Sequence, residues 1–117
     1  MEQFARVEPV LMVRDVSRAL AFYAELGFEE VFRDDDHAPM FAMVARDAAC
    51  LAMQGHDYEG IAGDRPVLRF PAHDVDALSE EFAGVADRTE VTDTSWGTRE
   101  FHVRDPDGNG LQFYADL

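Results

Sequence analysis

The sequence predicts an α+β protein built from two similar halves, each of which is a strand, a helix and three further strands. Residues 13–16 (VRDV) resemble residues 72–75 (AHDV), which lie 59 positions later in a chain of 117 residues. In both halves an apolar or alternating stretch precedes the Asp-Val pair, and apolar residues at helical spacing follow it. A repeat of half the chain length therefore organises the sequence.

The first half begins with a predicted strand over Val7–Val13 and a helix over about Ser17–Leu26. Ser17 is a candidate N-cap, because a short side-chain oxygen can accept hydrogen bonds from the free amides of the first turn. Gly27 can end the helix, since glycine tolerates a left-handed backbone. Three strands are expected next, near Glu29–Arg33, Met40–Ala45 and Ala49–Gln54.

The second half repeats this order, beginning with a strand over Val67–Ala72. Its helix is indicated by apolar residues at steps of three, four and three, namely Val75, Leu78, Phe82 and Val85. Asp76 is the candidate N-cap of this helix. The turn signal Asp105–Asn109 (DPDGN) lies between the last two of three strands expected near Thr89–Thr92, Thr98–Arg104 and Gly110–Tyr114.

A glycine-containing segment without clear periodicity separates the two halves. We predict one domain over residues 1–117, with module one at about 5–55, a linker at about 56–65 and module two at about 66–117. One helix can cover only one face of a four-stranded sheet, so each module keeps an uncovered face. We therefore expect two curved sheets around a concave groove.

Composition excludes several classes of partner. The formal net charge is −14 and repels phosphate backbones and anionic lipids, so neither nucleic acid nor a membrane is expected as a partner. No apolar run approaches the roughly 20 residues of a membrane span. Residues 1–6 lack the apolar region of a signal peptide, which leads us to expect a cytoplasmic protein. Cys50 is the only cysteine, which excludes an intrachain disulfide, and it is expected to be a small buried hydrophobe.

In this order and spacing, the motifs resemble the vicinal-oxygen-chelate superfamily, also called the glyoxalase, bleomycin resistance and dioxygenase superfamily. The resemblance is carried by residues 9–16 (PVLMVRDV), 22–28 (FYAELGF), 74–78 (DVDAL), 96–101 (WGTREF) and 105–109 (DPDGN). It covers nearly the whole chain and implies the paired βαβββ modules of that family. The superfamily includes metal-dependent isomerases, thiol transferases, ring-cleaving dioxygenases and metal-free drug-binding proteins, so the site residues must decide the function.

The positions that hold the metal ion in the enzymes of the superfamily carry poor ligands here. In those enzymes, His or Glu side chains from the first and last strands of both halves bind one divalent ion. The corresponding residues are Glu8, Val67 and Gln112, and the repeat shift places Met53 opposite Gln112. A register slip of one residue would place Gln54 there instead. Because such a set does not suit an open catalytic metal site, we expect no metal and no other cofactor.

Other catalytic arrangements are not indicated either. The serines lie in no strand-turn-helix elbow, and Cys50 has no evident activating base. A structural or solvated role is expected for each of the four histidines, His37, His56, His73 and His102. A metal site assembled from unexpected positions stays an alternative, but the sequence favours a protein that is not an enzyme.

What remains resembles the bleomycin resistance branch, whose members are small acidic dimers that sequester an antibiotic without modifying it. In that branch, a tryptophan at the position of Trp96 and aromatic residues near Phe32 and His37 sandwich the flat heteroaromatic tail of the drug. His37 is a smaller, titratable ring, so another planar antibiotic is an alternative ligand. Acidic side chains at the rim would favour a cationic drug. The further candidate ligand-binding residues are Gln54, Tyr58, Met12 and Tyr114.

The resemblance also implies a homodimer in which two chains exchange their first strands and helices. An apolar groove formed by one chain would leave a patch that monomers seldom expose, which favours the same conclusion. Arg99 and Glu100 alternate on one strand, so at most one of them points into the groove. Two other functions stay open: a metal-dependent glyoxalase-like isomerase, thiol transferase or dioxygenase, and a dimeric interaction module without a small ligand.

Overall fold

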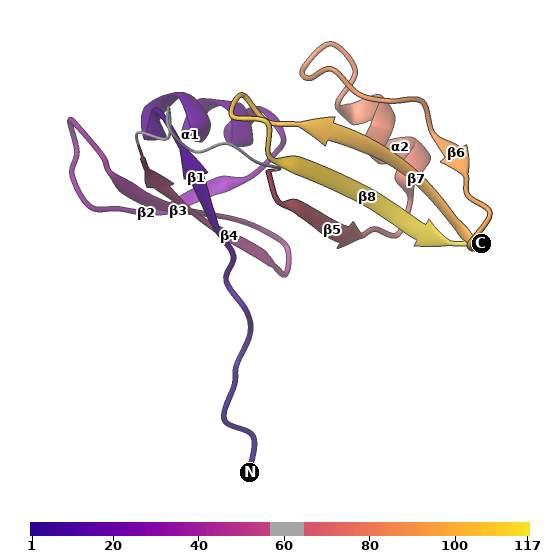
Figure 1. The fold of residues 1–117 in the computed structure, drawn as a ribbon, viewed down its shortest axis with the longest axis horizontal. Coiled ribbons are helices and arrows are strands. Elements are labelled where there is room, and N and C mark those ends of the chain that lie inside the picture. Colours follow the sequence, from indigo (N-terminus) through magenta and orange to yellow (C-terminus); the bar gives the residue numbers. More distant parts are fainter. Residues whose placement is uncertain (57–64) are drawn as a thin grey trace. The chain divides into compact units, whose positions relative to one another are not determined.

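Each half of the chain folds into a four-stranded mixed sheet with one helix on one of its faces (Figure 1). The structure is a computed structural model, and it describes residues 1–56 and 65–117. The chain divides into two compact units, Met1–Ile61 and Ala62–Leu117. The predicted α+β class with two βαβββ repeats is confirmed, whereas the groove and the strand-exchanged dimer stay predictions.

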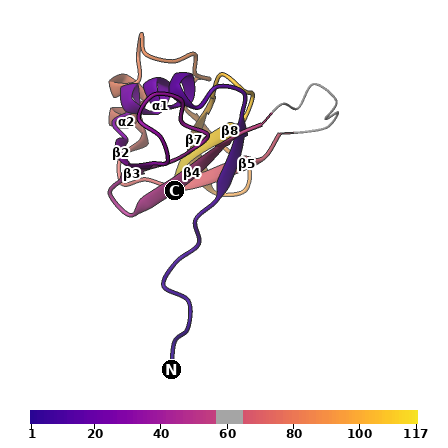
Figure 2. The ribbon, with the colours of Figure 1, turned by 90° about the vertical axis from the view of Figure 1, so that its left-hand side faces the viewer.

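The first unit contains β1, α1 and the strands β2 to β4, in the sheet order β1-β4-β3-β2. β1 runs parallel to β4, and the other pairs are antiparallel. Residues 1–9 precede the sheet as an extended, largely exposed segment, so the first strand is shorter than predicted (Figure 2). The bounds are β1 Val10–Val13, α1 Val16–Glu25, β2 Glu29–Arg33, β3 Phe41–Arg46 and β4 Ala49–Gly55.

Helix α1 packs through an apolar side that surrounds Tyr23. This ring is fully buried and makes edge contacts with Phe22 and Phe28, at centroid distances of 5.3 and 5.7 Å. Gly27 ends the helix with a φ of 85°, as expected. The cap at the other end is Asp15 rather than Ser17, because its carboxylate accepts a hydrogen bond from the Arg18 amide at 3.1 Å.

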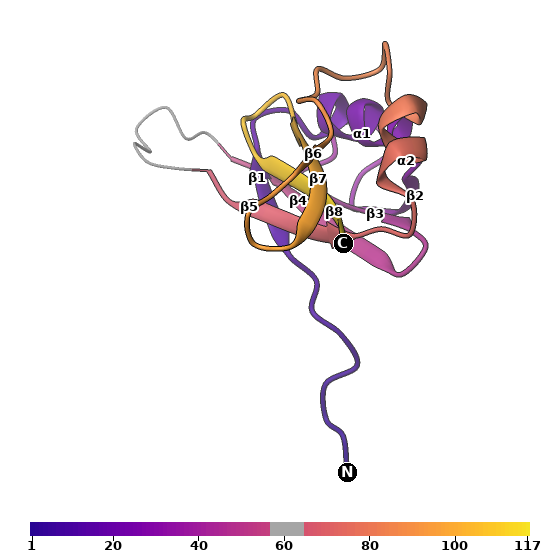
Figure 3. The ribbon, with the colours of Figure 1, turned by 90° about the vertical axis from the view of Figure 1, so that its right-hand side faces the viewer.

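The second unit repeats the topology with the order β5-β8-β7-β6, and Figure 3 views it from the side of β6 and α2. β5 is parallel to β8, and the other pairs are antiparallel. The bounds are β5 Val67–Pro71, α2 Val75–Glu81, β6 Thr92–Asp93, β7 Thr98–Arg104 and β8 Gly110–Asp116.

Aromatic rings form the core of the second unit. Phe70, Phe113 and Phe101 are paired across β5, β8 and β7, and their rings stack at centroid distances of 5.0 and 5.2 Å. Phe82, at the end of α2, meets Phe113 at 5.5 Å and closes the cluster from the helix side. This core fixes which side of β7 and β8 faces the helix.

Three local predictions for the second unit are wrong. The N-cap of α2 is Asp74, which accepts a hydrogen bond from the Ala77 amide, and not Asp76. The helix ends before Val85, because the chain turns through Gly84 with a φ of 76°. The strand predicted near Thr89–Thr92 is short. The Thr89 hydroxyl accepts a hydrogen bond from the His102 amide, and only Thr92–Asp93 pairs regularly with β7.

No helix in the described part of the chain is long and apolar enough to cross a membrane.

Candidate functional site

The first sheet carries a mostly apolar face opposite α1, here called the first open face and defined by Met12, Phe32, Phe41, Met43 and Gln54. Alternate residues of β1, β3 and β4 are buried beneath the helix, so these side chains point to the other side. Strand pairing places Gln54 between Met12 and Phe41, and Phe32 beside Met43. The candidates Met12, Phe32 and Gln54 therefore share one face.

Two aromatic rings dominate that face. Phe32 is 50% exposed, and its ring meets the edge of Phe41 at a centroid distance of 6.2 Å. Phe41 was not among the predicted site residues, although its alternation with the buried Ala42 is the signal that places it there. An exposed pair of rings offers a surface on which a flat ligand can pack.

His37 lies in the loop between β2 and β3, and not on the sheet. Asp35 holds this loop by accepting hydrogen bonds from the amides of His37 and Ala38 at 2.9 and 2.7 Å. These bonds lower the pKa of the Asp35 carboxyl. Asp34 accepts in the same way from the Met40 and Phe41 amides. Two acidic residues therefore shape the loop that presents His37.

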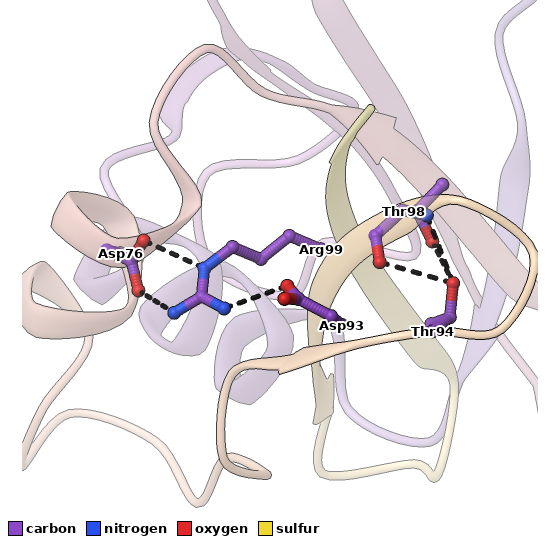
Figure 4. Close-up of polar contacts among 5 residues, drawn as sticks. All are labelled: Asp76, Asp93, Thr94, Thr98 and Arg99. Carbon is purple, nitrogen blue, oxygen red and sulfur yellow. Dashed lines mark hydrogen bonds and ion pairs between the residues drawn. The ribbon is translucent and has the colours of Figure 1, made fainter. Parts of the chain in front are cut away.

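Trp96 projects from the tight turn between β6 and β7. Its side chain is 68% exposed, and in residues 1–56 and 65–117 the indole makes no hydrogen bond or ring contact. Gly97 follows with a φ of 97°, a backbone conformation that favours glycine. On either side of the turn, Thr94 and Thr98 hold each other through backbone and hydroxyl groups, with 2.8 Å between the hydroxyls (Figure 4). The exposed indole is thus carried by a firmly closed turn.

An arginine bridge fixes the base of this turn to helix α2. Arg99 donates two hydrogen bonds to Asp76, at 3.0 and 2.9 Å, and one to Asp93 at 2.9 Å (Figure 4). The bond from Arg99 lowers the pKa of the Asp76 carboxyl. Because Asp93 lies in β6 and Asp76 in α2, the guanidinium joins both strands of the hairpin to the helix.

The second sheet carries a polar face opposite α2, here called the second open face and defined by Arg69, Glu100, His102, Gln112 and Tyr114. Strand pairing places Gln112 between Arg69 and His102, and Tyr114 beside Glu100. The candidate Tyr114 is partly buried, and the Arg69 guanidinium lies 3.8 Å from the centre of its ring. Tyr114 is therefore already covered by a cation on one side.

Glu100 is the buried charge of the second open face and is only 4% exposed. Its carboxylate accepts hydrogen bonds from the Thr98 hydroxyl at 3.1 Å and the Gln112 amide at 3.0 Å, and His102 Nε2 lies 3.2 Å away. Burial raises the pKa of the Glu100 carboxyl, but these hydrogen bonds together hold it below its ordinary value. Of Arg99 and Glu100, only Glu100 lies on the face opposite the helix. Sequence reasoning had not included this carboxylate among the candidates.

The residues at the expected metal positions do not all lie on an open face. Met53 lies in the core beneath α1, whereas Gln112 lies on an open face, so the predicted equivalence of the two is wrong. Five residues separate the paired Arg104 and Gly110, against four between their counterparts Ala45 and Cys50, so a constant shift fails by one residue beyond that turn. Within residues 1–56 and 65–117, no three His, Cys, Asp or Glu side chains are grouped to hold a metal ion.

Glu8 contacts other groups. Its carboxylate accepts a hydrogen bond from the Arg6 guanidinium at 2.9 Å and another from the Cys50 thiol, with 3.6 Å between the sulfur and the oxygen. Burial and the bond to Glu8 raise the pKa of the Cys50 thiol, which disfavours a nucleophilic thiolate. Cys50 is partly exposed, and not buried as predicted. The candidate Tyr58 lies outside the described residues.

Comparison with known proteins assigns the family. The model of the Glyoxalase/Bleomycin resistance protein/Dioxygenase superfamily matches residues 3–113. The chain belongs to this superfamily. No curated protein matches the sequence.

Several solved structures share the superfamily fold over nearly the whole chain. A bleomycin-binding protein from bleomycin-producing Streptomyces verticillus, complexed with copper(II)-bleomycin, is 33% identical, with a TM-score of 0.83 and 100% coverage of both chains. A bleomycin resistance determinant encoded on the transposon Tn5 is 22% identical, with a TM-score of 0.82 over 97% of this chain and 98% of that one. A lactoylglutathione lyase from Agrobacterium tumefaciens is 18% identical, with a TM-score of 0.75 over 97% and 96%. A bleomycin-binding protein, a bleomycin resistance determinant and a lyase therefore share this fold.

Proposed function

We propose that this superfamily member binds a small planar antibiotic of the bleomycin type and sequesters it without altering it chemically. The observation that carries the proposal is the exposed indole of Trp96 on a closed turn. Large aromatic side chains are normally at least partly covered, because their burial removes much apolar area from water. An exposed indole on a hydrogen-bonded turn is suited to stack on a flat ring system. The 33% identity to a bleomycin-binding protein supports the same ligand class.

The first open face carries a second exposed aromatic surface. Phe32 is half exposed beside Phe41, and Met12 and Met43 provide adaptable apolar contacts next to them. We include Met12, Phe32, Gln54, Trp96 and Tyr114, with His37 and Tyr58, in the proposed ligand-binding set. The net charge of −14 favours association with a cationic ligand and reduces it at high salt.

The proposal is tested by titrating the protein with metal-free bleomycin and with copper(II)-bleomycin. Trp96 is the only tryptophan, so its emission reports on the proposed surface. We expect saturable quenching with about one drug per subunit, and calorimetry on the same samples provides a control for drug absorbance. A flat response in both assays would exclude bleomycin as the ligand.

The absence of chemistry is proposed separately from binding. The family resemblance places Glu8, Val67 and Gln112 at the metal-ligand positions of the superfamily's enzymes, and neither these residues nor the buried Met53 suit a catalytic metal. We expect bleomycin recovered after prolonged incubation to be unchanged in mass, with and without added divalent metal. A modified drug that requires the metal would instead support an enzyme of this superfamily.

We further propose that the protein acts as a homodimer. Exposed apolar residues of the first unit, among them Val10, Val31 and Met40, would be covered at least in part by a second chain. Light scattering coupled to size-exclusion chromatography gives the molar mass directly. A mass of one chain at micromolar concentration would refute the dimer.

A further inference from the structure

The second open face contains a buried carboxylate that controls how its neighbours present their hydrogen-bonding atoms. Glu100 is only 4% exposed, and its pKa is held below the ordinary value, so the carboxyl group is ionised near neutral pH. An ionised carboxylate has no proton and can only accept hydrogen bonds. Every group bonded to it must therefore donate.

This requirement fixes the orientation of Gln112. Its side-chain nitrogen Nε2 lies 3.0 Å from Glu100 Oε2 and donates to it. Because the amide is planar, its oxygen Oε1 is turned away from the carboxylate. In the described part of the chain, Oε1 receives no hydrogen bond, and the nearby Arg69 guanidinium is stacked on Tyr114.

The same requirement fixes the tautomer of His102. Its Nε2 atom lies 3.2 Å from Glu100 Oε1, so in the neutral ring the proton must be on Nε2. The other ring nitrogen, Nδ1, is then an acceptor. The His102 side chain is 46% exposed, so part of the ring is open to solvent.

The two free acceptors belong to one small patch. His102 and Gln112 are direct partners in the pairing of β7 with β8, and both are bonded to the same carboxylate. Among the five residues that define this face, the formal charges of Glu100 and Arg69 sum to zero, so the ligand group need not be an ion. A nitrogen that carries two N–H donors can bond to two neighbouring acceptors at once.

We propose that Gln112 Oε1 and His102 Nδ1 form an acceptor pair for an NH₂ or NH₃⁺ group of the ligand, with Glu100 as the positioning residue that orients both. The inference deepens the proposed function and rests on it, since it names the polar group that the bound molecule carries. It selects ligands with a primary carboxamide or amine over isosteric esters or acids, because an ester oxygen facing these acceptors would leave them unpaired.

The orienting role is tested on the ligand-free protein by ¹⁵N NMR of the histidine rings. We expect the neutral His102 ring to carry its proton on Nε2, and we expect Glu100→Gln to give a mixture of tautomers, since a carboxamide can donate as well as accept. Glu90→Gln, at an exposed position in the same unit, is the charge-matched control and should leave the His102 signals unchanged. A wild-type ring protonated on Nδ1 would overturn the proposal.

The acceptor pair is tested with aromatic probes that differ only in their polar group: 2-naphthamide, 2-naphthylmethylamine, methyl 2-naphthoate and 2-naphthoate. We expect the amide or the amine to bind at least about fivefold more tightly than the ester and the acid, which corresponds to about one hydrogen bond. Which of the two binds better tells whether the donor is neutral or charged.

Variants separate this preference from stacking. Glu100→Gln should reduce the preference for the amide or amine probe over the ester and the acid. His102→Leu, at a more exposed position, gives the same test if the first variant is unstable. Equal affinity of all four probes for the wild type, or no binding of any, would overturn the acceptor pair. The bleomycin titration decides the proposed function independently.

Discussion

Replacing Trp96 with alanine gives the most direct test of the stacking surface, and its magnitude follows from exposure. An aromatic side chain of this size has roughly 200 Å² of surface, and 68% of Trp96 is exposed, which leaves roughly 140 Å² available. A flat ligand on one face of the ring covers about half of this area, or roughly 70 Å². At about 25 cal/mol per Å², the loss is about 1.8 kcal/mol, or roughly a 20-fold increase in Kd.

The same exposure predicts that the substitution leaves the fold intact. Because the indole contacts so little of the described chain, the free energy of unfolding should change by less than about 0.5 kcal/mol. Calorimetric titration with copper(II)-bleomycin measures the Kd without using tryptophan emission, and urea unfolding measures stability. Phe4→Ala is the matched control, because this ring is 92% exposed and lies outside both sheets.

Two results would refute the reasoning. An unchanged Kd in Trp96→Ala would remove the indole from the ligand-binding surface. A large loss of stability would show that the indole packs against the protein, so that weaker binding could not be assigned to stacking.

Three further substitutions test the supports of this site. Gly97→Ala should destabilise the protein by about 1 kcal/mol, because its φ of 97° is strained for alanine, and should also weaken drug binding by displacing Trp96. The control Gly84→Ala has a φ of 76° and equally open space, so it should lose stability without losing drug affinity. Urea unfolding measures the stability, and calorimetry measures the affinity. The pKa of Glu100 is lowered in the folded state, so the stabilisation from its ionised carboxylate is present above the unfolded pKa of about 4.3 and is lost as pH falls through the folded pKa. Glu100→Gln should therefore lose less stability on acidification than the wild type does. The same loss of stability in both proteins would contradict a lowered pKa for Glu100. Gln112→Glu places a second carboxylate against Glu100 and should cost roughly 2 kcal/mol at neutral pH, partly recovered on acidification as one carboxyl takes up a proton; a protein of unchanged stability at pH 7 would argue against the contact.

The repeat and the order of elements could be predicted because they depend on local signals. An Asp-Val pair opens each helix, and the strands Glu29–Arg33 and Thr98–Arg104 have the predicted bounds. Both capping residues were misassigned by two positions, because Asp15 and Ser17, like Asp74 and Asp76, all have short side chains that can accept hydrogen bonds from a first turn. Only the geometry of the backbone decides between them.

The faces of the sheets were harder to predict than the strands. The side-chain period is two, so an error of one residue in register moves a side chain from the core to the opposite face. Met53 and Gln112 were equated for this reason, since the unequal turns before β4 and β8 are not evident from a constant shift. The network around Glu100 was missed because it joins residues of two strands, and only pairing brings them together.

The strand order has a consequence for the order in which each unit folds. In both sheets the central hairpin, β3–β4 or β7–β8, closes through a turn of a few residues, whereas the parallel strand β1 or β5 joins it only across a span of about 40 residues. The hairpins should therefore form early, and β1 and β5 should dock last and detach first in partial unfolding. In hydrogen exchange, the amides that β1 and β5 donate to their sheets would lose protection before those of the hairpins. Met12 and Arg69 lie on these late strands, so the open faces are completed only in the final step of folding.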